Sequence, residues 1–208
     1  MKAIRIYETG SPEVLKIEEL QLPDPQKGEV RIRHTAIGFN FQDIYTRSGQ
    51  YAAPLPTGLG TEAVGIVEAI GPDVSDFKVG DRVCYASGPV LAACATHRNY
   101  PTARLLHAPA HMKDEEIAAS LLKGMTVEYL MERCYPVQKG QYVLMHAAAG
   151  GVGLLAGQWG QHLGARMIEV YPRLTSLITR GTITLTHTGL FNTRLFKGGQ
   201  PWLIAVLM

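Results

Sequence analysis

The sequence predicts an α/β protein with a β-barrel-like part at its N-terminus. Short strand patterns separated by glycine and proline turns fill the first part of the chain. Over residues 141–170, a short apolar run, a glycine-rich turn, a helical stretch and a second apolar run follow one another, as in a parallel βαβ unit. The length of 208 residues and the hydrophobic content of 46% allow one large domain or two small ones with a real core.

The N-terminal strands are expected over residues 2–7, 14–20 and 29–36. Val30, Ile32 and His34 alternate along the third strand, so they should share one face.

A short helix should follow, with Asn40 or Asp43 as its N-cap. The next strand is expected over residues 61–70, where Gly65 indicates a bend, and another leads through residue 85.

A longer helix is predicted to begin at the acidic run after Lys113, because carboxylates favour the first turn. Apolar side chains follow near helical spacing and predict a core-facing stripe: Ile117, Leu121, Leu122, Met125, Tyr129 and Leu130.

The glycine-rich turn reads Ala148-x-Gly150-x-x-Gly153, a variant of a dinucleotide-binding fingerprint with alanine in the first place. The missing side chains let backbone N–H groups approach a pyrophosphate, and Gly153 lets the helix pack close to the strand. The helix expected over residues 151–163 directs its positive end at that anion, and Gly164 ends it. A plain glycine-rich turn is the alternative, but the strand before it and the helix after it favour dinucleotide binding.

Charge and composition exclude several function classes. A net charge of +2 implies neither nucleic acid nor an anionic membrane as a partner. The N-terminal residues lack a signal-peptide pattern and no apolar run could span a bilayer, so we expect a cytoplasmic protein. The three cysteines suit a reducing compartment without disulfides. Cys94 and His97 have no further ligand at suitable spacing, so a thiol is the better interpretation than a metal site.

Several motifs occur together in a fixed order: Asn40-Phe-x-Asp43-x-Tyr45, Gly58-Leu-Gly-Thr-Glu-Ala-x-Gly65, Gly80-Asp-Arg-Val83, Leu122-Lys-Gly-x-Thr126 and His146-Ala-Ala-Ala-Gly-Gly-Val-Gly153. Through them the chain resembles, over roughly residues 1–168, the bacterial quinone oxidoreductases (NADPH:quinone reductases, ζ-crystallin-like) of the medium-chain dehydrogenase/reductase superfamily.

The resemblance implies a GroES-like catalytic domain over residues 1–119 and a partial Rossmann, or doubly wound, domain over residues 120–170. Residues 171–208 are then a divergent tail, in which residues 174–188 resemble the family's late edge strand, which often helps to form a dimer, so a homodimer is allowed. An unrelated or frame-shifted tail is the alternative. A full Rossmann domain has six strands, more than this tail can complete. We therefore expect one face of the strands around residues 142 and 165 to lack partners, and the activity of the short chain to be weak or absent unless a partner completes the sheet.

The resemblance also implies a metal-free site. Zinc-dependent relatives carry a cysteine and a histidine where this chain has Asn40 and Thr61, and a catalytic zinc needs three protein ligands. Glu62 is then expected to be a hydrogen-bonding residue.

The implied activity is reduction of a small-molecule quinone by NADPH, with Asn40, Tyr45 and Tyr51 as the catalytic, substrate-side residues. Asn40 could orient a carboxamide, a substrate carbonyl or water, and the tyrosines offer phenol donors and an aromatic wall, with plain packing as their alternative. The cofactor-binding positions carried over are Asn40, Thr126, Ala148, Gly150, Gly151, Val152 and Gly153.

Two points stay open. Lys123 is either an exposed lysine or part of the cofactor site, and NADPH is taken from the resemblance, since Glu169 and Tyr171 do not decide between NADPH and NADH. The competing functions are a non-catalytic remnant that binds only a nucleotide or partner, and a reductase of enone or alkenal double bonds.

Overall fold

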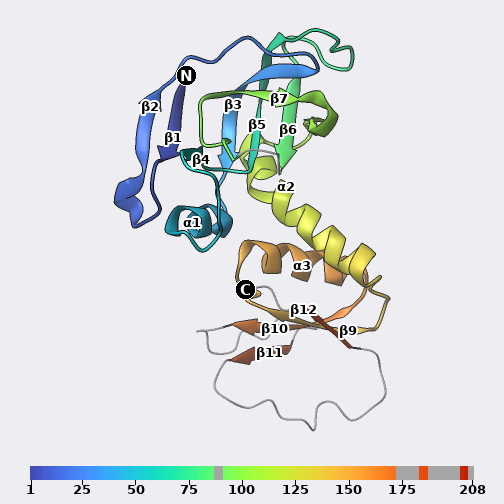
Figure 1. The fold of residues 1–208 in the computed structure, drawn as a ribbon. Helices are drawn as coiled ribbons and strands as arrows, with labels where there is room; N and C mark the ends of the chain where they lie inside the picture. Colours follow the sequence, from blue (N-terminus) through green and yellow to red (C-terminus); the bar gives the residue numbers. More distant parts are fainter. Residues whose placement is uncertain (87–90, 172–182, 187–201, 206–208) are drawn as a thin grey trace. The chain divides into compact units, whose positions relative to one another are not determined.

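A computed structural model describes residues 1–86, 91–171, 183–186 and 202–205 (Figure 1). The chain divides into two compact units, residues 1–122 and residues 123–208. No helix in the described part of the chain is both long enough and apolar enough to cross a bilayer.

The first unit contains two antiparallel sheets (Figure 1). The three-stranded sheet has the order β2-β1-β4, with bounds Lys16–Glu19, Lys2–Ile6 and Thr57–Gly58. The five-stranded sheet has the order β7-β3-β5-β6-β8, with bounds His97–Pro101, Glu29–Gly38, Glu62–Ile70, Arg82–Ala86 and Leu106–His107. The helix α1 is Phe41–Ser48, and short 3₁₀ turns are Pro12–Val14 and Thr102–Arg104.

The segment 94–96 joins the two sheets, which explains the barrel-like character of this unit. Ala3 forms a β-bridge with Ala95, and the Ile4 N–H donates to the Cys94 carbonyl at 2.8 Å. The enclosed core is made of buried side chains from both the strands and the loops: Val30, Ile32, Ala63, Val67, Phe77, Val83, Tyr85, Ala93, Tyr100 and Leu105.

The predicted strands are mostly confirmed, with one shortened. Val30 and Ile32 are fully buried and His34 is half-buried, so the predicted common face is correct. The strand expected over residues 14–20 begins only at Lys16, because a 3₁₀ turn with Pro12 in its first position precedes it. At Gly65, a Cβ would overlap the carbonyl oxygen of β3 behind it, next to a register shift in the β3–β5 pairing.

The helix α2 is Asp114–Glu128, and a π-helical segment, Tyr129–Cys134, extends it. The predicted stripe is correct at Ile117, which is buried, but wrong at Met125 and Tyr129, which are exposed. Val127 and Met131 are buried in their place. A step of two residues turns a helix by about 200°, so the side chains buried towards the C-terminal end lie on the side opposite Met125 and Tyr129.

The second unit is a parallel sheet with a helix packed on it. Its elements are β9 Tyr142–His146, α3 Gly151–His162, β10 Arg166–Tyr171, β11 Ile183–Thr186 and β12 Trp202–Ala205. The sheet order is β11-β10-β9-β12 with parallel pairs throughout. In chain order this is third, second, first, fourth, the order with which a doubly wound sheet begins. The buried core of this unit includes Val127, Met131, Val137, Val143, Met145, Ala148, Ala156 and Met167.

The edges of the strands near residues 142 and 165 are paired among the described residues, and the expectation that one face of these strands lacks partners stays a prediction. β12 pairs with β9 and β11 pairs with β10. The alternating residues 183–186 and the apolar residues 202–205 therefore each form a strand. They can do so because the pair of β9 and β10 has two open edges, and each edge accepts one parallel neighbour.

Candidate functional site

One candidate site lies within the second unit, at the turn between β9 and α3. Ala147 has φ 53°, and the Gly150 N–H donates to the Ala147 carbonyl at 2.8 Å, which closes the turn. Gly150 is the N-cap of α3. A Cβ on Gly153 would overlap the backbone of Ala148, which is itself buried, so the helix approaches the turn as closely as its backbone permits.

This turn is suited to an anion. The first N–H groups of a helix have no partner within the helix, and the helix dipole places partial positive charge beside them. No acidic residue stands in the first turn of α3 to oppose an anion. The Gly150 to Gly153 segment therefore fits the pyrophosphate of a dinucleotide, by the absence of side chains and by its electrostatics.

The predicted cofactor residues of the second unit lie in two places, the start of α3 and the helix α2. The side chain of Lys123 on α2 reaches the start of α3. Ala148, Gly150, Gly151, Val152 and Gly153 form the turn and the first turn of α3. A Cβ on Gly151 would stand 2.7 Å from Cδ and 2.8 Å from Cε of Lys123.

The Lys123 stem therefore crosses the start of α3. Thr126 is three residues further along α2, on the same face as Lys123. Lys123, whose role the sequence left open, thus belongs with the candidate site and brings a cation to the anion-binding end of α3.

The other candidate site lies within the first unit and is built around α1. Asn40 is the N-cap of α1, and its backbone N–H donates to Oδ2 of Asp43 at 3.0 Å. The other oxygen of Asp43 accepts the Gly60 N–H at 2.8 Å. Asp43 is buried, so it fixes the helix start against the 58–60 loop and thereby fixes where Asn40 stands.

Aromatic rings line α1 next to Asn40. The Tyr45 and Tyr51 rings are 5.2 Å apart, and the Phe41 and Tyr45 rings are 6.0 Å apart. Gly49 has φ 86°, a left-handed turn after which the Tyr51 N–H donates to the Tyr45 carbonyl at 3.0 Å. The structure thus brings the two predicted tyrosines together.

Phe41 completes this aromatic row, and its side chain is 71% exposed, so it is available for contact with a ligand. The sequence analysis missed it. Its spacing of four residues from Tyr45 on one helix was the signal that could have found it.

Thr61 and Glu62 occupy the places where zinc-dependent relatives are expected to carry a ligand pair. Glu62 is fully buried and accepts hydrogen bonds from the Asn40 side chain at 2.8 Å and the Leu122 N–H at 2.7 Å. The expectation that Glu62 serves as a hydrogen-bonding residue agrees with these contacts. Thr61 is buried and its hydroxyl has no hydrogen-bond partner in the structure as described. Among the described residues, no group of three potential metal-ligating side chains gathers.

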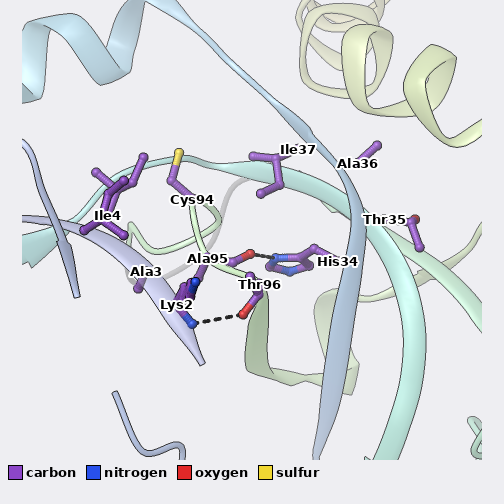
Figure 2. A pocket seen from close by; sticks show the side chains of 11 residues that line it. Lys2, Ala3, Ile4, His34, Thr35, Ala36, Ile37, Cys94, Ala95 and Thr96 are labelled. Atoms are coloured by element: carbon purple, nitrogen blue, oxygen red, sulfur yellow. Dashed lines mark hydrogen bonds between the residues drawn. The ribbon is translucent and has the colours of Figure 1, made fainter. Parts of the chain in front are cut away.

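A separate cavity of about 480 Å³ opens between β1, β3 and the 94–96 segment (Figure 2). None of the predicted site residues lines it. His34 donates through Nδ1 to the Ala95 carbonyl at 2.7 Å, and burial raises the pKa of the Cys94 thiol to about 11. Its wall is mainly apolar and its thiol is neutral at physiological pH, so the cavity offers no evident chemistry.

Comparison with known proteins places the fold and the candidate site in a family. The family model of the alcohol dehydrogenase GroES-like domain matches residues 26–131. The chain belongs to this family. The matched stretch contains α1, the 58–60 loop, Glu62 and nearly all of α2.

The relatives are oxidoreductases of the medium-chain dehydrogenase/reductase superfamily, so the predicted resemblance is confirmed. A quinone oxidoreductase of Pseudomonas aeruginosa is 48% identical over 168 residues, which are 80% of this chain and 51% of that protein. A 2-haloacrylate reductase of a Burkholderia species is 39% identical over 198 residues, or 92% of this chain and 59% of that protein.

A solved structure agrees. The crystal structure of Escherichia coli quinone oxidoreductase complexed with NADPH matches with a TM-score of 0.81 and 44% identity, and covers 83% of this chain and 53% of that chain. The chain spans about half the length of the curated relatives it matches.

Proposed function

We propose that this chain carries the cofactor-binding turn and the substrate-side residues of an NADPH-dependent quinone oxidoreductase. The observation that carries the proposal is the turn of small residues and glycines at the N-terminus of α3, with the Lys123 stem across Gly151. Quinone oxidoreductase relatives at up to 48% identity and a similar structure with bound NADPH support the same cofactor and reaction.

The residues of the second unit would hold the cofactor by its phosphates. The N–H groups of Gly151, Val152 and Gly153 would donate to pyrophosphate oxygens, and Lys123 would add a cation. The chemistry that NADPH supplies when bound is hydride donation to an acceptor.

The residues of the first unit would receive the flat acceptor. Phe41, Tyr45 and Tyr51 would stack against a quinone ring, and a phenol O–H would donate to the oxygen on which negative charge develops. A metal-free reaction agrees with this arrangement, because Glu62 is engaged by Asn40 and Leu122. A cytoplasmic location remains part of the proposal.

Reduction of an activated double bond is the second candidate. The 2-haloacrylate reductase relative aligns with 92% of the chain, more than the quinone oxidoreductases do. An enone or haloacrylate presents a carbonyl oxygen for the same phenol donors. In these substrates the hydride would go to the carbon–carbon double bond, whereas in a quinone it would go to the quinone ring system.

Nucleotide binding is tested first, without turnover. NADPH should quench or shift the fluorescence of the purified chain, and Gly153→Val should abolish the change because its side chain overlaps the Ala148 backbone. Gly124→Ala has no neighbour within 4 Å of the new Cβ and lies inside α2 of the same unit, so it controls for general glycine replacement. A wild-type chain that binds no NADPH contradicts the proposal.

Turnover separates the candidates. Rates of NADPH oxidation with 1,4-benzoquinone, an enone and 2-chloroacrylate should rank the quinone first. Phe41→Ala should raise KM for the quinone about fivefold, since ring stacking contributes on the order of 1 kcal/mol beyond burial. Binding of NADPH with no reduction of any acceptor would instead support the non-catalytic alternative.

A further inference from the structure

Gly151 is a glycine that the dinucleotide fingerprint does not require. It stands between Gly150 and Gly153, at a place where the pattern accepts any residue. Its backbone does not need a glycine either, because Gly151 is the first residue of α3 and its φ does not lie in the left-handed region. Glycine destabilises a helix relative to alanine, so another feature of the site should account for it.

The place of the missing Gly151 side chain is taken by Lys123. A Cβ there would stand 2.7 Å from Cδ, 2.8 Å from Cε and 3.7 Å from Cγ of that lysine, and these atoms are its nearest neighbours. Both residues belong to the second unit. At Gly153, by contrast, the overlap is with the backbone of Ala148. A side chain at position 151 would therefore displace a flexible stem, whereas one at position 153 would disturb the turn itself.

The Lys123 stem carries a cation to the start of α3. The ammonium lies one bond beyond Cε, the atom that stands over Gly151. The helix dipole places partial positive charge at the same end, which by itself disfavours a cation there. An anion at this place would be attracted by the lysine, by the dipole and by the first N–H groups of the helix. The lysine and the helix start therefore favour the same kind of ligand.

A nicotinamide nucleotide offers two phosphate positions that could meet this cation. In a doubly wound fold the diphosphate, which NADPH and NADH share, lies at the start of the helix that follows the first strand. The 2′-phosphate, which only NADPH carries, lies near the end of the second strand. In this chain those places are the start of α3 and the end of β10. The position of Lys123 favours the diphosphate.

We propose that Lys123 and Gly151 form one functional pair, in which the lysine binds the diphosphate shared by NADPH and NADH and the glycine leaves room for the lysine. Lys123 then determines how tightly a nicotinamide nucleotide binds and does not select between the two. The missing side chain of Gly151 serves the nucleotide only through the lysine, in contrast to that of Gly153. This assignment rests on the proposed function.

Two lysine variants test the first half of the pair. Lys123→Met keeps a stem of similar length without the charge, and Lys123→Ala removes the stem as well. Dissociation constants from fluorescence titration should rise about tenfold in both variants, for NADPH and NADH alike, because hydrogen bonds between charged groups are the stronger ones. The ratio of the two constants should stay within about twofold of wild type. The loss should shrink as salt is raised, because ions screen the charge.

A double-mutant cycle tests the second half of the pair. Gly151→Ala keeps the backbone N–H and displaces the Lys123 stem, so by itself it should weaken NADPH binding about three- to tenfold. In the Lys123→Ala background the stem is gone, so the same change should leave the dissociation constant within about twofold of K123A. It should also raise the melting temperature there, because alanine favours a helix more than glycine. Additive losses of affinity would mean that the glycine serves the nucleotide directly, and would overturn the pairing.

A second pair of lysine and glycine, at the other end of α3, is the matched control. Lys139 lies against Gly164, with its Cγ 3.0 Å from the place of a Cβ. Gly164 has φ 72°, so its backbone conformation explains the glycine. The dipole favours a cation at a helix C-terminus, so Lys139→Met should lower the melting temperature slightly and leave NADPH binding unchanged. An equal loss of affinity in K139M and K123M would reduce the effect to overall charge and overturn the inference.

The outcomes separate this inference from the proposed function. If wild type and K123M bind NADPH equally well, the inference is overturned and the reductase proposal stands. A loss confined to NADPH would assign Lys123 to the 2′-phosphate and would also overturn the inference. The predicted losses in a chain that reduces no acceptor support the inference and contradict the reductase proposal. A wild-type chain that binds no NADPH overturns both.

Discussion

At the scale of single residues, His34 links stability to pH. Its Nδ1 donates to the Ala95 carbonyl, so its Nε2 accepts from the Tyr85 hydroxyl at 3.0 Å and the ring is neutral. Burial first, and the nearby charges of Arg98 and His97 after it, lower the pKa of His34 from 6.5 to about 4, although the bond to Ala95 acts in the opposite direction. The unfolded chain therefore binds the proton more tightly than the folded protein.

We expect the free energy of unfolding to fall as pH is lowered from 6.5 towards 4. In this window the unfolded state holds more protons, so stability rises with pH, and the full loss is on the order of 3 kcal/mol. Urea titrations of wild type and His34→Gln at pH 7 and pH 4.5 measure it. H34Q keeps a donor and an acceptor but does not titrate, so an equal loss of stability in both proteins would contradict the assignment.

Thr61 gives a prediction of the opposite sign. Its buried hydroxyl has no hydrogen-bond partner in the described structure, so Thr61→Val should raise the free energy of unfolding by about 1 kcal/mol. Thr102 is the matched control, because its hydroxyl donates to the Gly28 carbonyl at 3.1 Å. Thr102→Val should therefore lower the free energy of unfolding by about 1 kcal/mol. Thermal unfolding of the two variants decides, and equal losses would mean that the Thr61 hydroxyl is engaged.

Residue roles were predictable only in part. The glycines of the α3 turn could be read from the sequence because their spacing follows from the approach of backbone to phosphate. The Asn40 to Glu62 contact could not, because it depends on the register of β3 against β5 and on the placement of α2. Neither is a local property of the sequence.

At the scale of elements, β3, β5 and α2 meet where Gly38 stands. Gly38→Ala should lower the free energy of unfolding by about 1–3 kcal/mol, since its Cβ would overlap the Ala118 carbonyl. Gly124→Ala is the control, because that glycine lies inside α2 with no atom within 4 Å of a new Cβ. G124A should stabilise the chain by about 0.5–1 kcal/mol, and denaturant titrations compare the two.

The types of the secondary-structure elements were predicted correctly more often than the faces that they bury. The strands follow from the local alternation of side chains, and the β9–α3–β10 arrangement follows from the glycine positions. Both signals can be read directly from the sequence. The buried face of α2 was mispredicted at Met125 and Tyr129, because apolar side chains can stand on an exposed helix face and periodicity alone does not say what covers them.

At the scale of the whole molecule, each unit holds complete hydrophobic clusters. All members of the clusters around Val30 and around Val64 lie within residues 1–122. We therefore expect a fragment of residues 1–122 to fold and to unfold cooperatively, since a chain of about this length can support its own core. The fragment should bind no NADPH, because the α3 turn lies outside it.

Circular dichroism against urea, with NADPH titrated in parallel, measures both properties. A fragment with no cooperative transition would show that the first unit depends on the second. The full-length chain under the same conditions is the reference.

The sequence analysis anticipated the barrel-like unit and the start of the doubly wound sheet. It did not anticipate that β11 and β12 flank the β9–β10 pair. Strand pairing across long connections depends on the whole sheet and not on nearby residues. The domain boundary at 119/120 and the roles of the site residues stay predictions.

The space at Gly38 also constrains how this scaffold can be engineered. A mutagenesis library aimed at new acceptors would vary residues 41, 45 and 51 of the aromatic row, in which Phe41 and Tyr51 are exposed. Position 38 should be held constant in such a library, because every other amino acid brings a Cβ into the same overlap. Clones that change it would be lost to misfolding before their selectivity could be screened.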